Sequence, residues 1–97
     1  IPLGIAIRII DRWIPENEGT WYWQISPEGN SFERTEEPWD IYLDIDTFLQ
    51  WLSGYIPADE LIRQHRILLR ADWQENDAMH TLEQIPVLHG LMINEIV

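Results

Sequence analysis

Three tryptophans are the clearest candidates for ligand-binding side chains in this chain. Trp21 and Trp23 lie two residues apart in a segment whose successive side chains are expected to point to opposite faces of a sheet, and Trp39 begins a second such segment. Indole rings on one sheet face can line an apolar pocket for a flat ligand such as a sterol, or bind a cationic amine through cation–π contacts. Core packing is the commoner use of a tryptophan stripe in a small domain. Pocket and core therefore stand as two open interpretations.

Metal chemistry finds little support in the sequence. His65, His80 and His89 lie in different expected elements, and none has a second histidine or cysteine at the spacing of a zinc site. The aspartates between residues 40 and 46 lack the glycine and the closing glutamate of a calcium loop, and their segment alternates like a strand. We therefore expect no metal site.

Paired carboxylates are the other candidates for acid–base chemistry. Glu36 and Glu37 fall at an expected turn, and Asp59 and Glu60 at an expected helix start, where acidic residues are common for structural reasons. No nucleophile elbow and no glycine-rich phosphate loop is present in the sequence. The chain therefore shows no catalytic motif of its own.

The strands that would position these residues follow from a period of two. Turn residues such as Asn17, Gly19 and Gly29 separate the first three segments. The third segment is polar, which is typical of an edge strand. The predicted strands cover residues 3–10, 20–26, 31–35 and 39–45. In the first strand one face is apolar and is expected to be buried; it consists of Leu3, Ile5, Ile7 and Ile9.

Helical spacing follows the last predicted strand. Asp46 is a candidate N-cap for a helix that Gly54 is expected to close as its C-terminal cap. The residues with helical spacing in this segment are Phe48, Leu49, Trp51, Leu52 and Tyr55. Pro57 and the acids after it favour the start of a second helix. An extended segment is expected at residues 67–69.

A third helix is expected over residues 73–85, and Pro86 is expected to stop it. The tail over 87–97 is apolar and is interpreted as buried structure. The expected strands precede the expected helices along the chain. This order predicts an α+β fold with an antiparallel sheet and short helices.

Composition narrows the function classes. Ninety-seven residues allow one domain. The net charge is −11 and all six basic residues are arginine, so phosphate backbones and anionic lipids are repelled, whereas basic protein surfaces and cationic small molecules are attracted. We expect no nucleic-acid binding and no membrane insertion, because the apolar runs are too short to span a bilayer. The absence of cysteine favours a reducing, cytoplasmic location.

The order of the expected elements is itself a pattern. An apolar strand ends in aspartate, an Asn-x-Gly turn leads to a second strand, a strand passes into a short helix that ends in Gly-Tyr, and an acidic helix start precedes an apolar tail. In this order, the chain resembles the C-terminal, sterol-carrier-like domain of Eis-type (enhanced intracellular survival) GNAT acetyltransferases. The matching segments are Ile5–Asp11, Asn17–Gly19, Trp21–Ile25, Ile41–Leu52, Gly54–Tyr55, Ala58–Leu61 and Ile93–Val97.

This resemblance implies a single sterol-carrier-like domain over residues 1–97, forming the C-terminal part of a longer chain. The start at Ile1 without methionine agrees with that expectation, and the fold is expected to lack its first elements. In the family the parent enzyme transfers acetyl from acetyl-CoA to an amine. The coenzyme site and general acid lie in the preceding GNAT region, so this chain needs no cofactor and is expected to be inactive alone.

The resemblance also implies how the domain would serve the enzyme. It would pack against the GNAT region, cover the acceptor site and support a homo-oligomer. The terminal carboxylate, here that of Val97, would project into the active site as a general base. The alternatives are burial of the tail in the core, a sterol-carrier-type module that binds a lipid or sterol, and a bare interaction domain. A longer parent polypeptide with an acetyl-CoA-binding region would distinguish the acetyltransferase function from the lipid-binding module and the interaction domain.

Overall fold

The chain forms a five-stranded sheet with three helices. The computed structural model describes residues 3–26 and 28–96, with side chains described from residue 4 to 26 and from 28 to 85. The fold class predicted from the sequence, α+β, is confirmed. In chain order the elements are β1 Leu3–Ile10, the 3₁₀ turn η1 Pro15–Asn17, β2 Gly19–Ser26, β3 Gly29–Arg34, β4 Ile41–Asp44, α1 Ile45–Leu52, α2 Ala58–Arg63, β5 Leu68–Leu69 and α3 Glu75–Ile96.

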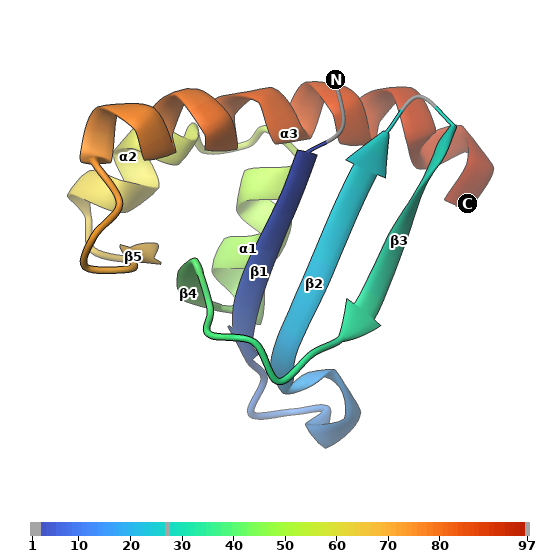
Figure 1. Ribbon diagram of the computed structural model, residues 1–97, viewed down its shortest axis with the longest axis horizontal. Coiled ribbons are helices and arrows are strands. Elements are labelled where there is room, and N and C mark those ends of the chain that lie inside the picture. Colours follow the sequence, from blue (N-terminus) through green and yellow to red (C-terminus); the bar gives the residue numbers. More distant parts are fainter. Residues whose placement is uncertain (1–2, 27, 97) are drawn as a thin grey trace.

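The sheet has the order β3-β2-β1-β4-β5 and is mixed (Figure 1). Three neighbouring pairs are antiparallel, but β4 runs parallel to the central strand β1. The purely antiparallel sheet expected from the sequence is therefore wrong at one pair. The reason is the connection between β3 and β4, which crosses from one side of β1 to the other. A period of two identifies which side chains share a face, but it carries no information on strand direction.

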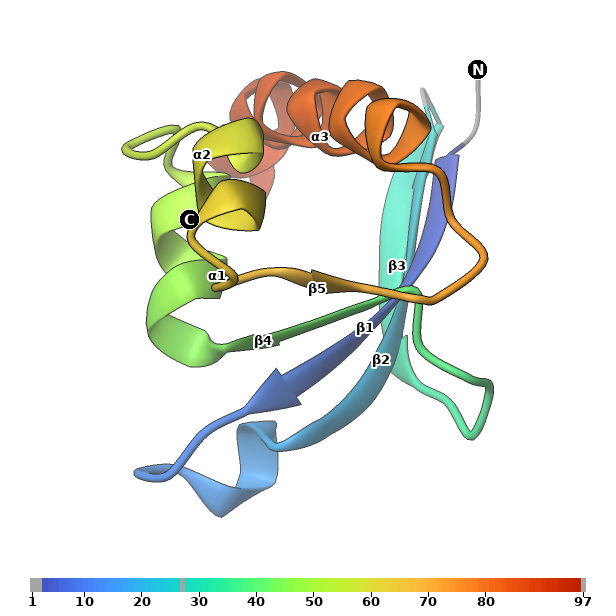
Figure 2. The same ribbon diagram turned by 90° about the vertical axis from the view of Figure 1, so that its left-hand side faces the viewer.

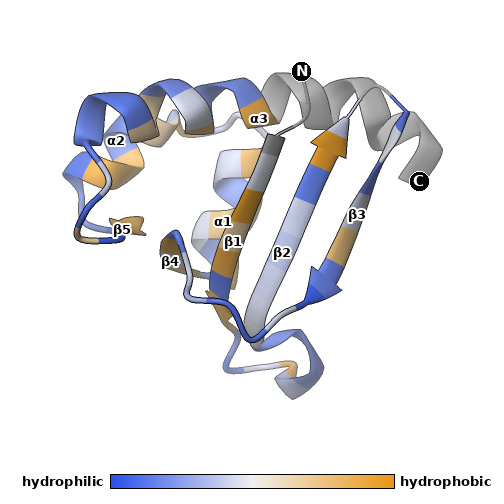
Figure 3. Ribbon diagram, viewed as in Figure 1, coloured by the Kyte–Doolittle hydropathy of each residue, from blue (hydrophilic) through white to orange (hydrophobic). Residues whose placement is uncertain are grey.

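The helices cover one face of the sheet. Figure 2 shows α1 and α2 on one side, α3 across the end of the sheet, and the connection between β3 and β4 on the opposite side. Along β1, Ile5, Ile7 and Ile9 face the helices and are fully buried. They pair with Trp23, Trp21 and Gly19 of β2, so the predicted apolar face of β1 is confirmed. Figure 3 shows this contrast between an apolar β1 and a hydrophilic β3–β4 connection.

The first helix begins two residues earlier than expected. Asp44, rather than the predicted Asp46, caps α1, because its carboxylate accepts a hydrogen bond from the Thr47 amide at 2.8 Å. Strand β4 ends at the same aspartate, so one residue closes the strand and opens the helix. The chain after α1 turns at Gly54, whose φ of 75° agrees with the predicted helix end.

The last helix continues past the proline that was expected to stop it. Helix α3 runs from Glu75 to Ile96 with Pro86 in its interior. Proline has no amide hydrogen to donate to the carbonyl four residues earlier, which is that of Leu82. That carbonyl instead accepts a buried hydrogen bond from the indole nitrogen of Trp51 in α1, at 3.0 Å. The side chain of a neighbouring helix thus replaces the bond that the proline cannot make.

Candidate functional site

Trp21 and Trp23 belong to a cluster of aromatic rings between the sheet and α1. Trp21 stacks on Phe32 of β3, with centroids 5.0 Å apart and planes inclined by 16°. Trp23 meets the edge of the same Phe32 ring at 5.8 Å and approaches Phe48 of α1 at 6.3 Å. Phe48 in turn lies 6.1 Å from the ring of Trp51. The cluster therefore links β2, β3 and α1.

Most of this cluster is used for packing. Trp23 is 3% exposed and Trp51 is fully buried, whereas Phe32 is 39% exposed. Rings packed edge to face at these distances leave no room for a flat ligand between them. Phe32, on strand β3, is exposed, whereas Trp21 and Phe48 are partly buried.

The free face of Trp21 is also occupied. The guanidinium of Arg34 lies 4.4 Å above the Trp21 ring and donates hydrogen bonds to the carbonyls of Glu16 and Glu18. The indole nitrogen of Trp21 donates to the carbonyl of Asn17 at 3.0 Å. The cation–π contact expected for a ligand amine is thus made by an arginine of the chain itself.

Trp39 lies on the other side of the sheet. Its ring packs against that of Tyr42 at 5.4 Å, and Tyr42 is the neighbour of Arg8 on the face turned away from the helices. The structure therefore does not bring Trp39 together with Trp21 and Trp23. The predicted strand began at residue 39, whereas β4 begins only at Ile41.

The other predictions concern the C-terminal residue, a metal site and a membrane span. Val97 lies outside the described residues. No group of three or more histidine, cysteine or acidic side chains gathers in a way that could hold a metal ion among the residues the structure describes. No helix in the described part of the chain is long and apolar enough to cross a membrane.

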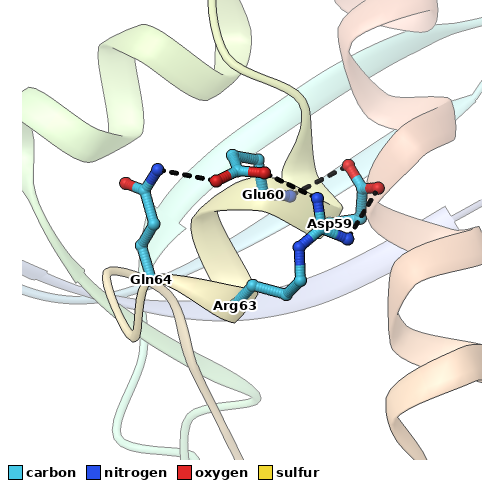
Figure 4. A network of polar contacts seen from close by, with 4 residues as sticks. All are labelled: Asp59, Glu60, Arg63 and Gln64. Atoms are coloured by element: carbon cyan, nitrogen blue, oxygen red, sulfur yellow. Dashed lines mark hydrogen bonds and ion pairs between the residues drawn. The ribbon is translucent and has the colours of Figure 1, made fainter.

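The acidic pair at the start of α2 forms a structural network (Figure 4). Arg63 pairs with Asp59 at 3.3 Å and with Glu60 at 2.6 Å, and Gln64 donates to Glu60 at 2.8 Å. The hydrogen bond from Arg63 lowers the pKa of Glu60, and the bond from Gln64 adds to this effect. A carboxylate held ionised in this way on the surface stabilises one turn of helix and is poorly suited to act as a general acid.

Asp11 organises the turn between β1 and β2. Its buried carboxylate accepts hydrogen bonds from the amides of Trp13 and Ile14, both at 2.9 Å, and from the side chain of Asn17 at 3.0 Å. The bonds from Ile14 and Asn17 are the main reasons that the pKa of Asp11 is lowered. The loop that carries the exposed Trp13 is therefore held in one conformation.

Asp40 has a structural role that the sequence did not predict. Its amide and its carboxylate bond to the carbonyl and the amide of Ala6, each at 2.8 Å, which fastens the β3–β4 connection onto β1. The carboxylate also forms an ion pair with Arg70, and the Arg70 amide donates to the Asp40 carbonyl at 2.9 Å. The charge of Asp40 gave no signal of this role, because acidic residues alternate throughout that segment.

Beside this connection the helix-free face is hollowed. A shallow, open hollow of about 580 Å³ lies between Ala6 and Tyr22 on one side and Glu33, Glu37 and Asp40 on the other. A second hollow of about 730 Å³ follows along the same face and is lined by Arg8, Thr20 and Glu36 among others. Both are open grooves on the sheet surface rather than enclosed ligand cavities.

Comparison with known proteins identifies the family of this domain. The sterol carrier protein domain family matches residues 3–87. The chain belongs to that family. No curated protein matches it. The matched residues include the whole sheet, α1, α2 and α3 as far as residue 87.

Solved structures show the same fold inside longer chains. A conserved protein of unknown function from Enterococcus faecalis V583, described as a probable N-acyltransferase, matches 88% of this chain at a TM-score of 0.70 and 21% identity. A GCN5-related N-acetyltransferase from Kribbella flavida matches 88% at a TM-score of 0.71 and 13% identity. The chain spans only 20% and 21% of the length of these proteins. The sterol carrier protein domain thus resembles a portion of each.

Proposed function

We propose that this sterol carrier protein domain is the C-terminal accessory domain of a longer GCN5-related N-acetyltransferase polypeptide. One observation carries the proposal: the fold of nearly the whole chain recurs in about a fifth of an N-acetyltransferase chain. The organisation of the described residues supports it, because the aromatic cluster is packed as core and no catalytic group is assembled there. The domain is a scaffold that supports a reaction catalysed elsewhere in the polypeptide.

In this proposal the acetyl-CoA site and the general acid belong to the region that precedes the domain. The domain packs against that region, covers the acceptor site and supports a homo-oligomer. Its net charge of −11 attracts a cationic amine towards the site. The terminal carboxylate of Val97 would accept the proton that an ammonium substrate must lose before it attacks the acetyl group.

The test is acetyl transfer from acetyl-CoA to small amines by the complete polypeptide. We expect turnover by the complete polypeptide and none by residues 1–97 alone. Removal of Val97, with Glu83→Gln on the exposed side of α3 as a control, is expected to lower kcat by about 10²-fold or more if the terminal carboxylate is the base. Turnover by the isolated domain would contradict the proposal, and full activity without Val97 would remove the role of that residue alone.

A lipid- or sterol-binding module is the second candidate. Membership of the sterol carrier protein domain family and the exposed edge of Phe32 favour it. Titration of the chain with a fluorescent fatty acid and a fluorescent sterol tests it directly. Saturable binding that Phe32→Ala weakens would support this function, whereas the packing of Trp21 and Trp23 leads us to expect no saturable binding.

A further inference from the structure

The sheet face turned away from the helices carries an unusual set of side chains for a solvent-facing surface. We call it the outer face and define it by Ala6, Arg8, Tyr22, Trp39 and Tyr42. The strand register places Tyr22 beside Ala6 and Tyr42 beside Arg8 on this face. Solvent-facing positions of a sheet are usually polar. Tyrosine, tryptophan and arginine are the residue types that dominate the energy of protein–protein interfaces.

Small residues of β1 lie beneath the Tyr22 ring on the outer face. A side chain added at Gly4 would meet the Tyr22 hydroxyl at 2.0 Å, so the tyrosine ring lies directly over the backbone of β1. Ala6, the next residue on this face, contributes only a methyl group. Tyr22 is nevertheless 40% exposed. Two small residues on the central strand therefore hold an aromatic ring flat and leave its outer surface open.

Arg8 lies on this face and has no partner among the residues that the structure describes. It is the one charged residue of β1 and is half-buried between Thr20 and Tyr42. Among the described residues its guanidinium forms no hydrogen bond and no ion pair, whereas Arg34, Arg63 and Arg70 all do. A partly desolvated guanidinium without a partner is costly, and a carboxylate placed opposite it would remove that cost.

Acidic side chains of β3 and the connection after it line the hollows of the same face. The carboxylates of Glu33, Glu36 and Glu37 line the two hollows and form no ion pair with any described residue. Two copies of this chain, each with a net charge of −11, would bring like charges together at such a surface. The charge pattern instead fits a partner with a carboxylate at its centre and basic side chains around it.

We propose that the outer face is the surface through which this domain docks onto the acetyltransferase region of its own polypeptide. That region supplies a carboxylate opposite Arg8 and lysine or arginine side chains opposite Glu33, Glu36 and Glu37. The rings of Tyr22, Trp39 and Tyr42 provide the apolar contact between these charges. The inference rests on the proposed function, because it identifies the surface that this function requires.

The experiment uses the complete polypeptide with a protease site inserted immediately before residue 1. After folding and cleavage, the dissociation constant of the released domain from the remaining region is measured by sedimentation over a dilution series. Arg8→Glu and Glu37→Lys test the outer face. Arg12→Glu, in the exposed β1–β2 loop, and Glu83→Lys, on α3, make the same charge changes elsewhere and serve as matched controls.

We expect Arg8→Glu and Glu37→Lys each to raise the dissociation constant by about tenfold or more, and the two controls to leave it within about threefold. Unchanged circular dichroism and thermal unfolding of the released variants show that the domain remains folded. Equal effects of outer-face and control variants, or no association of the wild-type pieces, would overturn the docking surface. A native polypeptide without an acetyltransferase region would instead overturn the proposed function, and it would be recognised before any cleavage.

Discussion

Trp51 and Pro86 are predicted to be energetically coupled through one carbonyl group. Pro86 cannot donate a hydrogen bond to the carbonyl of Leu82, and the Trp51 indole donates to it instead at 3.0 Å. Trp51 and Leu82 are both fully buried, so water cannot replace the bond. In Trp51→Phe the carbonyl loses its donor. In Pro86→Ala the restored amide can donate to the same carbonyl within the helix.

The magnitudes follow from this geometry. A buried acceptor without a donor costs about 1–3 kcal/mol, and the smaller ring of Trp51→Phe adds a packing loss. Pro86→Ala alone is expected to be stabilising, since proline in a helix interior is roughly 3 kcal/mol less favourable than alanine. The packing loss is common to both backgrounds and cancels in a double-mutant cycle. We therefore expect Trp51→Phe to cost about 1–2 kcal/mol less when residue 86 is alanine.

Urea unfolding followed by far-ultraviolet circular dichroism measures the four free energies of the cycle without relying on tryptophan emission. Each kcal/mol corresponds to a change of roughly 4–8 °C in Tm for a domain of this size, so thermal unfolding provides a second reading. Additive effects, within about 0.5 kcal/mol, would refute the reasoning. They would mean that the indole bond does not compensate for the missing amide of Pro86.

Two further predictions concern the sheet and its first turn. Gly4→Ala should lower the free energy of unfolding by about 1 kcal/mol, because the new methyl group displaces the Tyr22 ring. The same change made in Tyr22→Ala should be neutral or stabilising, and chemical denaturation that shows the same loss in both backgrounds would rule out the contact. The lowered pKa of Asp11 adds stability that is fully present above its ordinary value of 3.8 and is lost as the pH falls through the lower, folded-state value. Asp11→Asn should therefore show a smaller drop in urea midpoint than the wild type between pH 6 and pH 3, and an equal drop would contradict this assignment.

The sequence was most informative where one pattern decided one property. The alternation from Leu3 to Ile10 predicted both the extent of β1 and its buried face, and both are confirmed. The polar composition of β3 predicted its place at the edge of the sheet, which is confirmed. Gly54 was predicted to end α1, and its positive φ agrees. In each case the local chemistry of the segment was sufficient.

The errors arose where a distant part of the chain changed the outcome. Pro86 did not stop α3, because Trp51, 35 positions earlier in the numbering, supplies the donor that the helix lacks. The direction of β4 depends on where the preceding connection crosses the sheet, and Asp40 fastens that connection to Ala6. Trp39 belongs to the same crossing segment and therefore lies on the opposite face from Trp21. None of these contacts leaves a periodic pattern in the sequence.

The intact mass of the native polypeptide, detected in its source cell with an antibody raised against residues 1–97, tests the central claim most directly. The account predicts a mass several times the 11.6 kDa of this chain, since 88% of this chain spans only 20% and 21% of the matched probable N-acyltransferase and N-acetyltransferase chains. A native mass near 11.6 kDa would contradict the account, because no acetyltransferase region would then be present for the domain to serve.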